Sequence, residues 1–297
     1  MDRLKADASR DPRAALLALA AIALWGFLAL LSSRLGKLPP LLMTGIALTV
    51  GGMVGLLKVR DWKVPARTFV IGVGGIFGYH FLLFTGFRHA PTVEANLINY
   101  LWPLLIVVLS PVILTGYSLR PRHVLGALAG LAGAALIVSG GSFRPDAANL
   151  PGYAAAAGAA LVWAVYSLLT KRLPTFPSGA VGGFCLAAGL LALSVSLVEY
   201  GPAGFAAIGG LDWLFLVLLG LGPMGTAFFL WDASLKRGDP RVIGSLSYLT
   251  PLLSTLALVA IGGKPFTALS AAAMALIIAG AVIGSLPRKT RQKLAQA

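Results

Sequence analysis

Apolar residues dominate ten stretches of this 297-residue chain, and short polar segments separate them. Each stretch holds about 20 residues, the number that a helix needs to cross the roughly 30 Å hydrocarbon core of a bilayer. Lipid offers no water to unpaired backbone groups, so such stretches should be helices. The pattern predicts an all-α polytopic membrane protein that forms a single membrane domain over residues 1–297. The predicted spans are 14–33, 39–57, 68–87, 92–114, 122–140, 152–170, 178–198, 211–232, 240–261 and 267–286.

Composition supports a membrane protein. Hydrophobic residues make up 58% of the chain and charged residues only 11%, whereas soluble domains are about 25% charged. Such a chain cannot cover its surface with polar groups, so lipid must contact it. The net charge of +14 would favour nucleic-acid binding in a soluble protein. Here the basic residues form short clusters between apolar runs and no basic helix face, so we expect membrane lipid and no nucleic acid as partner.

The basic clusters also predict the orientation of the spans. Cytoplasmic loops of membrane proteins carry an excess of Lys and Arg. If the N-terminus is cytoplasmic, 19 of the 24 Lys and Arg residues fall on the cytoplasmic side and 5 fall outside. We therefore predict ten spans with both termini in the cytoplasm. The cytoplasmic clusters would be 3–13, 58–67, 120–122, 171–172, 236–241 and 288–293.

The second half of the chain repeats features of the first half. The sequence Asn-Tyr-Leu-Trp-Pro at 99–103 aligns with Ser-Tyr-Leu-Thr-Pro at 247–251, at an offset of 148 positions, as from 103 to 251. Trp25 pairs with Trp163 at an offset of 138, as from 25 to 163. Five spans separate the members of each pair, so the two copies should have opposite orientations, as in many secondary transporters. We predict two inverted five-helix repeats, residues 14–140 and 152–286.

Glycines predict where helices approach closely. Three GxxxG pairs begin at Gly51, Gly74 and Gly126, and such pairs let helix backbones touch. Residues 220–225 match the dinucleotide fingerprint GxGxxG. That match lies inside an apolar span with no βαβ unit around it, so we do not interpret it as a nucleotide site.

Polar side chains inside a bilayer are energetically costly, so their positions indicate function. The fourth span is the richest in them, with Asn96, Asn99, Tyr100 and Trp102 before Pro103. Helical spacing places several of these residues on one face, and the proline removes a backbone hydrogen bond and kinks the helix. We expect the four polar and aromatic residues to bind a substrate. The alternative is that the amides only hold helices together.

Three further spans offer candidate binding residues. His80 in the third span can hydrogen-bond a carboxylate or carry a proton, although it could also be a satisfied structural group. Trp163 lies near the middle of its span, where it could fill the core, stack on a planar substrate or attract an ammonium group. The repeat makes the ninth span the partner wall of the fourth. The predicted substrate-binding residues are Tyr79, His80, Asn96, Asn99, Tyr100, Trp102, Trp163, Ser247 and Tyr248, with Glu94, Pro103 and Pro251 as candidates for coupling or gating.

Carboxylates and catalytic motifs are scarce. Of the carboxylates in the predicted spans, Glu94 could pair with Arg88 or His89, and Asp232 with the lysine four residues on. The sequence holds no HExxH, GxSxG or Walker A motif and no paired catalytic carboxylates. Its one cysteine, Cys185, excludes a CxxC metal framework. We expect a protein that is not an enzyme, with no catalytic residue, cofactor or metal site.

The ten spans, the two five-span halves and the short loops resemble the EamA-type drug/metabolite transporter superfamily over nearly the whole chain. Residues 93–103 closely resemble the fourth span of the YddG-type aromatic amino acid exporters, and residues 162–167 are similar to their sixth span. The resemblance implies export of aromatic and other neutral amino acids across a bacterial inner membrane by alternating access. It also implies a central cavity lined by Tyr79, His80, Asn99, Trp102 and Trp163.

Two other functions stay open at this point. An exporter of organic cations, drugs or other small metabolites would belong to the same superfamily, although small multidrug pumps that resemble it place a glutamate in the first span and residues 14–33 hold none. A channel-like or scaffold protein without turnover is the second alternative. Saturable flux and counterflow would distinguish a carrier from a pore.

Overall fold

The computed structural model describes residues 11–142, 144–261 and 265–285, and every regular element in these ranges is helical. Ten helical spans are long and apolar enough to cross a membrane, which confirms the predicted number and fold class. The basic clusters at residues 3–10 and 288–293, together with Lys264, lie outside the described residues. The spans are Pro12–Ser33, Pro40–Trp62, Ala66–His89, Thr92–Ile113, Pro121–Ser139, Ala147–Arg172, Ala180–Tyr200, Gly210–Arg237, Pro240–Ala260 and Ala268–Ser285.

Most spans hold more than one helical element. The elements in chain order are α2 (Pro12–Gly26), α3 (Leu28–Ser33), α4 (Pro40–Val54), η1 (Gly55–Trp62), α5 (Ala66–His89), α6 (Thr92–Asn99), α7 (Trp102–Ile113), α8 (Pro121–Ser139), η2 (Ala147–Asn149) and α9 (Leu150–Arg172). They continue with α10 (Ala180–Tyr200), α11 (Ala203–Ala206), α12 (Gly210–Leu221), η3 (Gly222–Thr226), α13 (Ala227–Arg237), α14 (Pro240–Leu246), α15 (Leu249–Ala260) and α16 (Ala268–Ser285).

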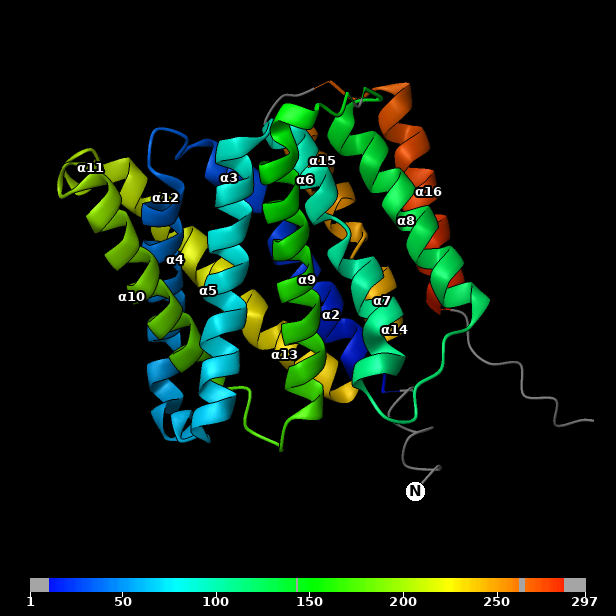
Figure 1. Cartoon of the computed structure of the whole chain (residues 1–297), viewed down its shortest axis with the longest axis horizontal. Helices are drawn as coiled ribbons and strands as arrows, with labels where there is room; N and C mark the ends of the chain where they lie inside the picture. The colour runs from blue at the N-terminus through cyan, green and yellow to red at the C-terminus, as the bar shows by residue number, and fades with distance from the viewer. Residues whose placement is uncertain (1–10, 143, 262–264, 286–297) are drawn as a thin grey trace, which may run out of the picture.

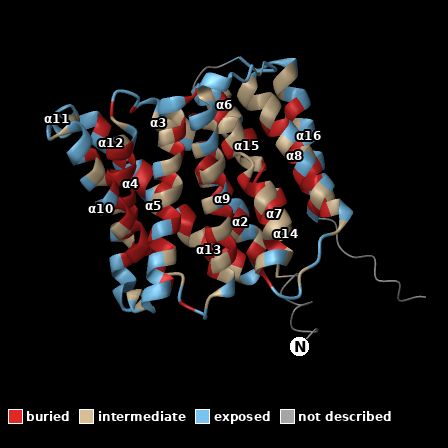
Figure 2. Cartoon of the chain, in the orientation of Figure 1, coloured by how far each residue is buried: buried red, intermediate tan, exposed pale blue. Residues whose placement is uncertain are grey.

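The spans stand side by side and alternate in direction (Figure 1). We call the face on which α2 begins the N-face, at the lower edge of Figure 1, and the other the opposite face. Helices α4 and α10 form one end of the bundle, and α8 packs against α16 at the other end. Buried residues follow the helix sides that meet inside the bundle (Figure 2), while apolar side chains such as Leu57 (89% exposed) point outward. A hydrophobic exterior of this kind requires lipid around it.

Two spans break within one residue of equivalent positions in the repeat. The fourth span changes from α6 to α7 at Tyr100 and Leu101, and the ninth changes from α14 to α15 at Ser247 and Tyr248. Each break lies just before a proline in the first turn of the second helix. A proline has no N–H to donate to the carbonyl four residues earlier, so the helical hydrogen bonds of the preceding segment end there. The predicted kink is therefore present, a few residues upstream of Pro103 itself.

Glycines hold the closest helix contacts, although not at every predicted pair. A Cβ on Gly126 would lie 2.6 Å from the backbone nitrogen of Gly284, so α8 and α16 meet backbone to backbone. A Cβ on Gly74 would meet nothing within 4 Å, and its neighbour Gly75 is the one that closely approaches another helix, at the ring of Tyr166 on α9. Glycine pairs therefore predict close packing only where the helix face carrying them meets another helix.

The glycines of the GxGxxG match serve packing too. The eighth span contains a π-helix, η3, between α12 and α13. A Cβ on Gly220 would lie 2.6 Å from the carbonyl oxygen of Ala47, and one on Gly225 would lie 2.7 Å from the Cα of Gly51. These glycines let the eighth span touch α4, which accounts for the motif without a nucleotide.

Candidate functional site

A cavity of about 390 Å³ lies inside the bundle and extends toward the opposite face. We call it the central cavity. Near that face its walls include Ser32 at the end of α3 and Thr92 at the start of α6, and Thr92 is exposed. At mid-bundle its walls are buried aromatic side chains. Seven predicted residues line this one cavity: Tyr79, His80, Asn96, Asn99, Tyr100, Trp102 and Trp163.

Three tryptophans that line the central cavity, with a fourth packed beneath them, form its floor. Trp25 of α2 lies edge-on to Trp102 of α7 and to Trp163 of α9, with ring centroids 6.2 and 6.0 Å away. Trp231 of α13 packs below them, 5.2 Å from the ring of Trp25 and 5.6 Å from that of Trp102. Edge-on aromatic pairs attract each other and contribute about 0.5–1.5 kcal/mol beyond their burial. The floor therefore closes the cavity toward the N-face.

Hydrogen bonds fix two of the floor tryptophans in place. The indole nitrogen of Trp25 donates to the carbonyl of Pro223 at 3.0 Å, within the π-helix η3. The indole nitrogen of Trp231 donates to the hydroxyl of Ser167 at 3.1 Å. Buried indole N–H groups need such partners. Trp25, Trp102 and Trp163 all line the cavity.

Helices α5 and α6 supply a tyrosine, a histidine and an amide to the cavity wall. The amide nitrogen of Asn99 donates to the hydroxyl oxygen of Tyr79 at 3.3 Å. The Nδ1 atom of His80 lies 2.8 Å from the carbonyl oxygen of Ile76, one turn earlier in α5. Because a carbonyl only accepts, Nδ1 carries a proton, and in a neutral imidazole Nε2 is then an acceptor. The wall thus presents both a hydroxyl donor and nitrogen or oxygen acceptors.

Three polar atoms of cavity-lining residues have no hydrogen-bond partner within the described part of the chain. They are the amide oxygen of Asn99 and the hydroxyl oxygens of Thr44 and Thr250. Buried polar groups are nearly always hydrogen-bonded, so each unpaired one requires an explanation. Three of them around one cavity, on α4, α6 and α15, are the arrangement expected where a polar ligand binds.

The lining of the central cavity carries no formal charge. Among the described residues that form its wall, none is Lys, Arg, Asp or Glu. A phosphate or sugar phosphate needs a cationic partner inside the site, and the wall offers none. The lining fits a solute whose charges cancel and whose side chain is apolar or aromatic.

Two predicted binding residues lie outside the lining of the central cavity. The hydroxyl of Ser247 donates to the carbonyl of Ile243 at 2.8 Å, inside its own helical segment. Tyr248 is fully buried and its hydroxyl donates to the backbone carbonyl of Tyr100 at 3.2 Å. A Cβ on Gly130 would lie 2.4 Å from the Tyr248 ring, so α8 holds this ring in place. Both side chains already have partners within the bundle, and the ninth span instead contributes Thr250 and Ser254 to the wall.

The gating candidates also have identifiable partners. Glu94 accepts a hydrogen bond from the hydroxyl of Tyr153 on α9, so neither of the basic partners expected from the sequence is the one it contacts. Arg88 instead pairs with Glu199 on α10. Pro103 and Pro251 are both buried at their helix breaks. Glu94 therefore joins α6 to α9 near the opposite face.

On the N-face, two lysines join α9 and the following loop to α13. The ammonium of Lys236 contacts the carboxylate of Asp232 at 2.6 Å, the predicted i+4 pair, and also the carbonyl oxygen of Phe176 at 2.9 Å. The ammonium of Lys171 donates to the carbonyls of Leu235 at 2.7 Å and Gly238 at 2.8 Å. Cations favour the carbonyl end of a helix. We call Lys171, Phe176, Asp232 and Lys236 the N-face cluster.

The turn that follows α13 is fixed by a second ion pair. The Asp239 carboxylate accepts from the backbone nitrogen of Arg241 at 2.9 Å, which caps α14, and pairs with its guanidinium at 2.5 Å. Burial opposes ionisation of Asp239, but the guanidinium outweighs it and holds the pKa of this carboxyl below its usual value. The turn bonded to Lys171 is thus itself anchored.

Sequence reasoning missed several residues of the cavity and its floor. Thr44 is a hydroxyl in an apolar span, but nothing in the local sequence separates it from hydroxyls that bond their own helix. Trp25 could have been found, because the repeat pairs it with Trp163. Phe228 lines the cavity and Trp231 lies under it, and both lie on the segment that follows η3. The π-helix rotates that segment, so a regular helical pattern misplaces its faces.

Comparison with known proteins decides the family. The model of the "EamA-like transporter family" matches the chain twice, over residues 12–139 and 150–286. The chain belongs to the EamA-like transporter family. These matches cover nearly all of the described residues and fall on the two predicted repeats. The opposite orientation of the two copies stays a prediction.

Similar EamA proteins include named exporters. The chain is 44% identical over 285 residues to a protein of Ancylobacter novellus named "Aromatic amino acid exporter YddG", covering 92% of this chain and 97% of that one. It is 26% identical to a protein of the same name from Salmonella typhimurium, covering 82% and 86% of the two chains. A crystal structure with 43% identity superposes with a TM-score of 0.85 and covers 91% of this chain and 95% of that one.

Family membership establishes the class of the protein. The chain is a multi-pass membrane transporter and not an enzyme, as the sequence predicted. Its similarity to the YddG exporters extends over most of both chains. The resemblance found on the fourth and sixth spans is therefore confirmed at the level of the whole chain.

Proposed function

We propose that this EamA transporter exports aromatic and other neutral amino acids from the cytoplasm across a bacterial inner membrane by alternating access. The observation that carries the proposal is the lining of the central cavity: tryptophan faces, unpaired amide and hydroxyl oxygens, and no charged side chain. An amino-acid zwitterion has this chemistry, because its two charges cancel and its side chain is apolar or aromatic. The names of its EamA relatives support the same substrate class.

The wall groups divide naturally between the two ends of a zwitterion. The Tyr79 hydroxyl accepts from Asn99 and keeps its own proton, which it can donate to a carboxylate together with the hydroxyls of Thr44 and Thr250. The Asn99 amide oxygen and the Nε2 atom of His80 can accept from the ammonium. Hydrogen bonds to charged groups contribute about 1.5–3 kcal/mol each. The binding energy is thus available without a buried ion pair.

The aromatic floor would bind the side chain of the substrate. Trp163 and Trp102 present ring faces and edges to the cavity, with Tyr79 5.1 Å and Phe228 5.4 Å from the ring of Trp163. Indole and phenyl side chains stack or pack edge-on against such rings. A substrate seated here would rest on the floor that closes the route to the N-face.

Alternating access requires the floor and the N-face cluster to open when the opposite face closes. The N-face cluster joins α9 and its loop to α13 through a small set of polar contacts, which can break and re-form as the helices move. The breaks at 100–101 and 247–248 supply hinges. The Tyr248–Tyr100 hydrogen bond links the two breaks across the bundle. We propose that it marks the pivot between the repeats.

The aromatic floor also favours one second candidate, an exporter of organic cations. Rings of tryptophan attract quaternary ammonium groups. The wall has no carboxylate to neutralise such a cation, which favours the amino acid instead. Counterflow with a quaternary ammonium compound in place of an amino acid separates the two.

The test is counterflow of radiolabelled tryptophan in proteoliposomes that contain the purified transporter. We expect saturable counterflow, and Trp163→Ala should reduce it by about fivefold or more, because a stacked aromatic contact contributes about 1 kcal/mol in addition to burial. Trp213→Ala is the matched control, since Trp213 is 45% exposed on the outer side of α12. Non-saturable flux, or equal effects of the two variants, would contradict the proposal.

A further inference from the structure

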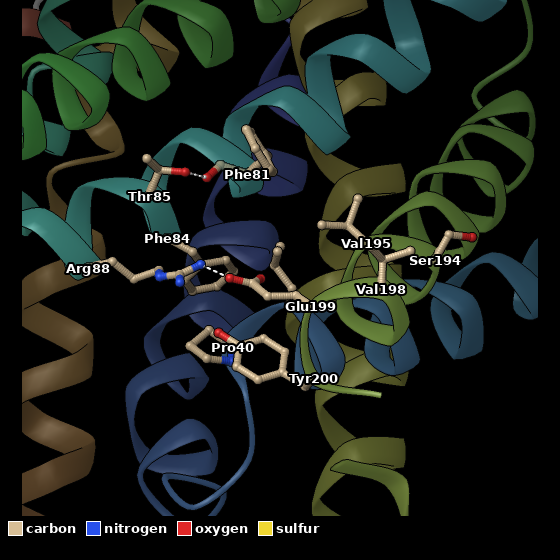
Figure 3. A pocket seen from close by; sticks show the side chains of 11 residues that line it. Pro40, Phe81, Phe84, Thr85, Arg88, Ser194, Val195, Val198, Glu199 and Tyr200 are labelled. Atoms are coloured by element: carbon tan, nitrogen blue, oxygen red, sulfur yellow. Dashed lines mark hydrogen bonds and ion pairs between the residues drawn. The ribbon is translucent and has the colours of Figure 1, made fainter. Parts of the chain in front are cut away.

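A second cavity, of about 430 Å³, lies between α5 and α10 near the opposite face. We call it the lateral groove (Figure 3). Its walls are mainly apolar and include Phe81 and Phe84 of α5 and Val195 and Val198 of α10. Phe84 also lines the central cavity. One aromatic side chain therefore lines both spaces.

The lateral groove faces outward from the bundle. Val198 is 90% exposed and Phe81 is 39% exposed, and both belong to membrane-spanning helices. In a bilayer the molecules that contact such side chains are lipids, because water is excluded from the hydrocarbon region. The apolar walls of the groove thus fit an acyl chain.

The rim of the groove carries one charge of each sign. Figure 3 shows Arg88 of α5 and Glu199 of α10 reaching toward each other above the side chain of Tyr200. Their contact joins Nη1 of the arginine to Oε1 of the glutamate. A guanidinium has five N–H donors and a carboxylate has two oxygens, and these side chains are 56% and 27% exposed, so both groups keep hydrogen-bonding capacity beyond their own contact.

The rim lies at the level where headgroups are found. Arg88 and Glu199 are within one or two residues of the ends of α5 and α10, and tyrosines such as Tyr200 gather at membrane interfaces. Arginine binds phosphate strongly, while a carboxylate accepts hydrogen bonds from a primary ammonium. A neutral rim with both groups matches a zwitterionic headgroup that can donate hydrogen bonds. A choline headgroup has no N–H, and an anionic headgroup leaves the glutamate without a cation.

We propose that the lateral groove binds one phosphatidylethanolamine molecule, with its phosphate on Arg88, its ammonium on Glu199 and an acyl chain between α5 and α10. The chain would rest against Phe84, the wall shared with the central cavity. Lipid in the groove would therefore stabilise the position of that wall.

The test is native mass spectrometry of the whole transporter released from nanodiscs that contain equal amounts of phosphatidylethanolamine, phosphatidylcholine and phosphatidylglycerol with identical acyl chains. The wild-type protein should retain phosphatidylethanolamine at least severalfold over the other two lipids. The charge-neutral double variant Arg88→Gln/Glu199→Gln should lose this preference. A matched control removes a different ion pair on the same face, Lys37–Asp212 at 2.7 Å, and Lys37→Gln/Asp212→Asn should keep the preference.

A second variant keeps the proposal testable if the double variant does not fold. Val198→Trp fills the groove from an exposed position and should reduce retention of every lipid. Equal retention of the three lipids by the wild type, or loss of the preference in the control pair, overturns the proposal. Displacement of the bound lipid by free phenylalanine in an Asn99→Leu background would identify the groove as a second amino-acid site and would also overturn it.

Discussion

The breaks in the fourth and ninth spans share a sequence pattern but have different surroundings. Asn99 lines the central cavity with an unpaired amide oxygen, whereas its counterpart Ser247 bonds its own helix. Tyr100 lines the cavity, while Tyr248 is fully buried against α8. At one pair of equivalent positions, Trp102 and Thr250, both side chains line the cavity. One copy thus supplies most of the candidate binding groups, and the other mainly holds helices together.

An internal repeat determines some features of a span and leaves others to packing. It determines where each helix breaks, because the proline and the residues before it recur at an offset of 148. It does not determine which side of the break faces the cavity, since that depends on the neighbouring helices. Gly130 of α8 makes room for the Tyr248 ring, so this tyrosine packs away from the cavity.

The largest expected effect comes from removing the polar group of the fourth-span break. Asn99→Leu removes an acceptor for the substrate ammonium, and hydrogen bonds to charged groups contribute about 1.5–3 kcal/mol. We expect counterflow of tryptophan to fall about 10- to 100-fold. Ser247→Ala should change it by less than about twofold, because its hydroxyl bonds only the backbone of its own helix. Initial rates in proteoliposomes measure both.

The pair is informative because the two positions are equivalent in the repeat. Equal losses of transport in both variants would mean that both breaks bind substrate, and the asymmetry between the copies would be wrong. Retention times on size-exclusion chromatography would show whether each variant is folded, so that a loss of rate can be assigned to binding.

The second effect concerns the helix that holds Tyr248 in place. Gly130→Ala should destabilise the protein by about 1–3 kcal/mol, because the added methyl group would lie 2.4 Å from the Tyr248 ring and would overpack the core. The control is Gly74→Ala, where a methyl group meets nothing within 4 Å. That control should be neutral or slightly stabilising, since alanine favours a helix more than glycine does.

Thermal unfolding in detergent measures this pair of glycine variants. A lower melting temperature for Gly130→Ala alone would confirm that α8 packs tightly against the ninth-span break. The same result for both glycines would show that the GxxxG pattern, and not the local packing, sets the contact.

The sequence predicted the fold well because hydropathy alone locates the spans. All ten predicted spans coincide with helices, and the polar cluster of the fourth span lies on the cavity wall. Backbone groups in lipid must be paired within the segment, so every apolar span forms a helix. Locating the apolar stretches is therefore enough to predict the helices. The kink predicted at the proline of the fourth span is also present, since proline acts locally.

The rest of the candidate site depends on three-dimensional packing. Ser247 and Tyr248 fulfil the same sequence pattern as their counterparts, but their partners are Ile243, Tyr100 and Gly130. Nothing in the local sequence identifies those partners. Thr44 lies in an apolar stretch, where a hydroxyl would be expected to bond its own helix. Only the structure shows that this hydroxyl has no hydrogen-bond partner among the described residues.

The smallest expected effect tests the contact between the two breaks. Tyr248→Phe removes the hydroxyl that donates to the Tyr100 carbonyl at 3.2 Å, and a single buried hydrogen bond contributes about 1 kcal/mol. We expect a fall of a few degrees in melting temperature with the KM for tryptophan nearly unchanged, because Tyr248 does not line the cavity. Tyr100→Phe keeps the backbone carbonyl and so keeps this bond, and should leave the melting temperature unchanged. If Tyr248→Phe instead raised the KM and left stability intact, Tyr248 would belong to the substrate site after all, and the two breaks would be alike in function as well as in sequence.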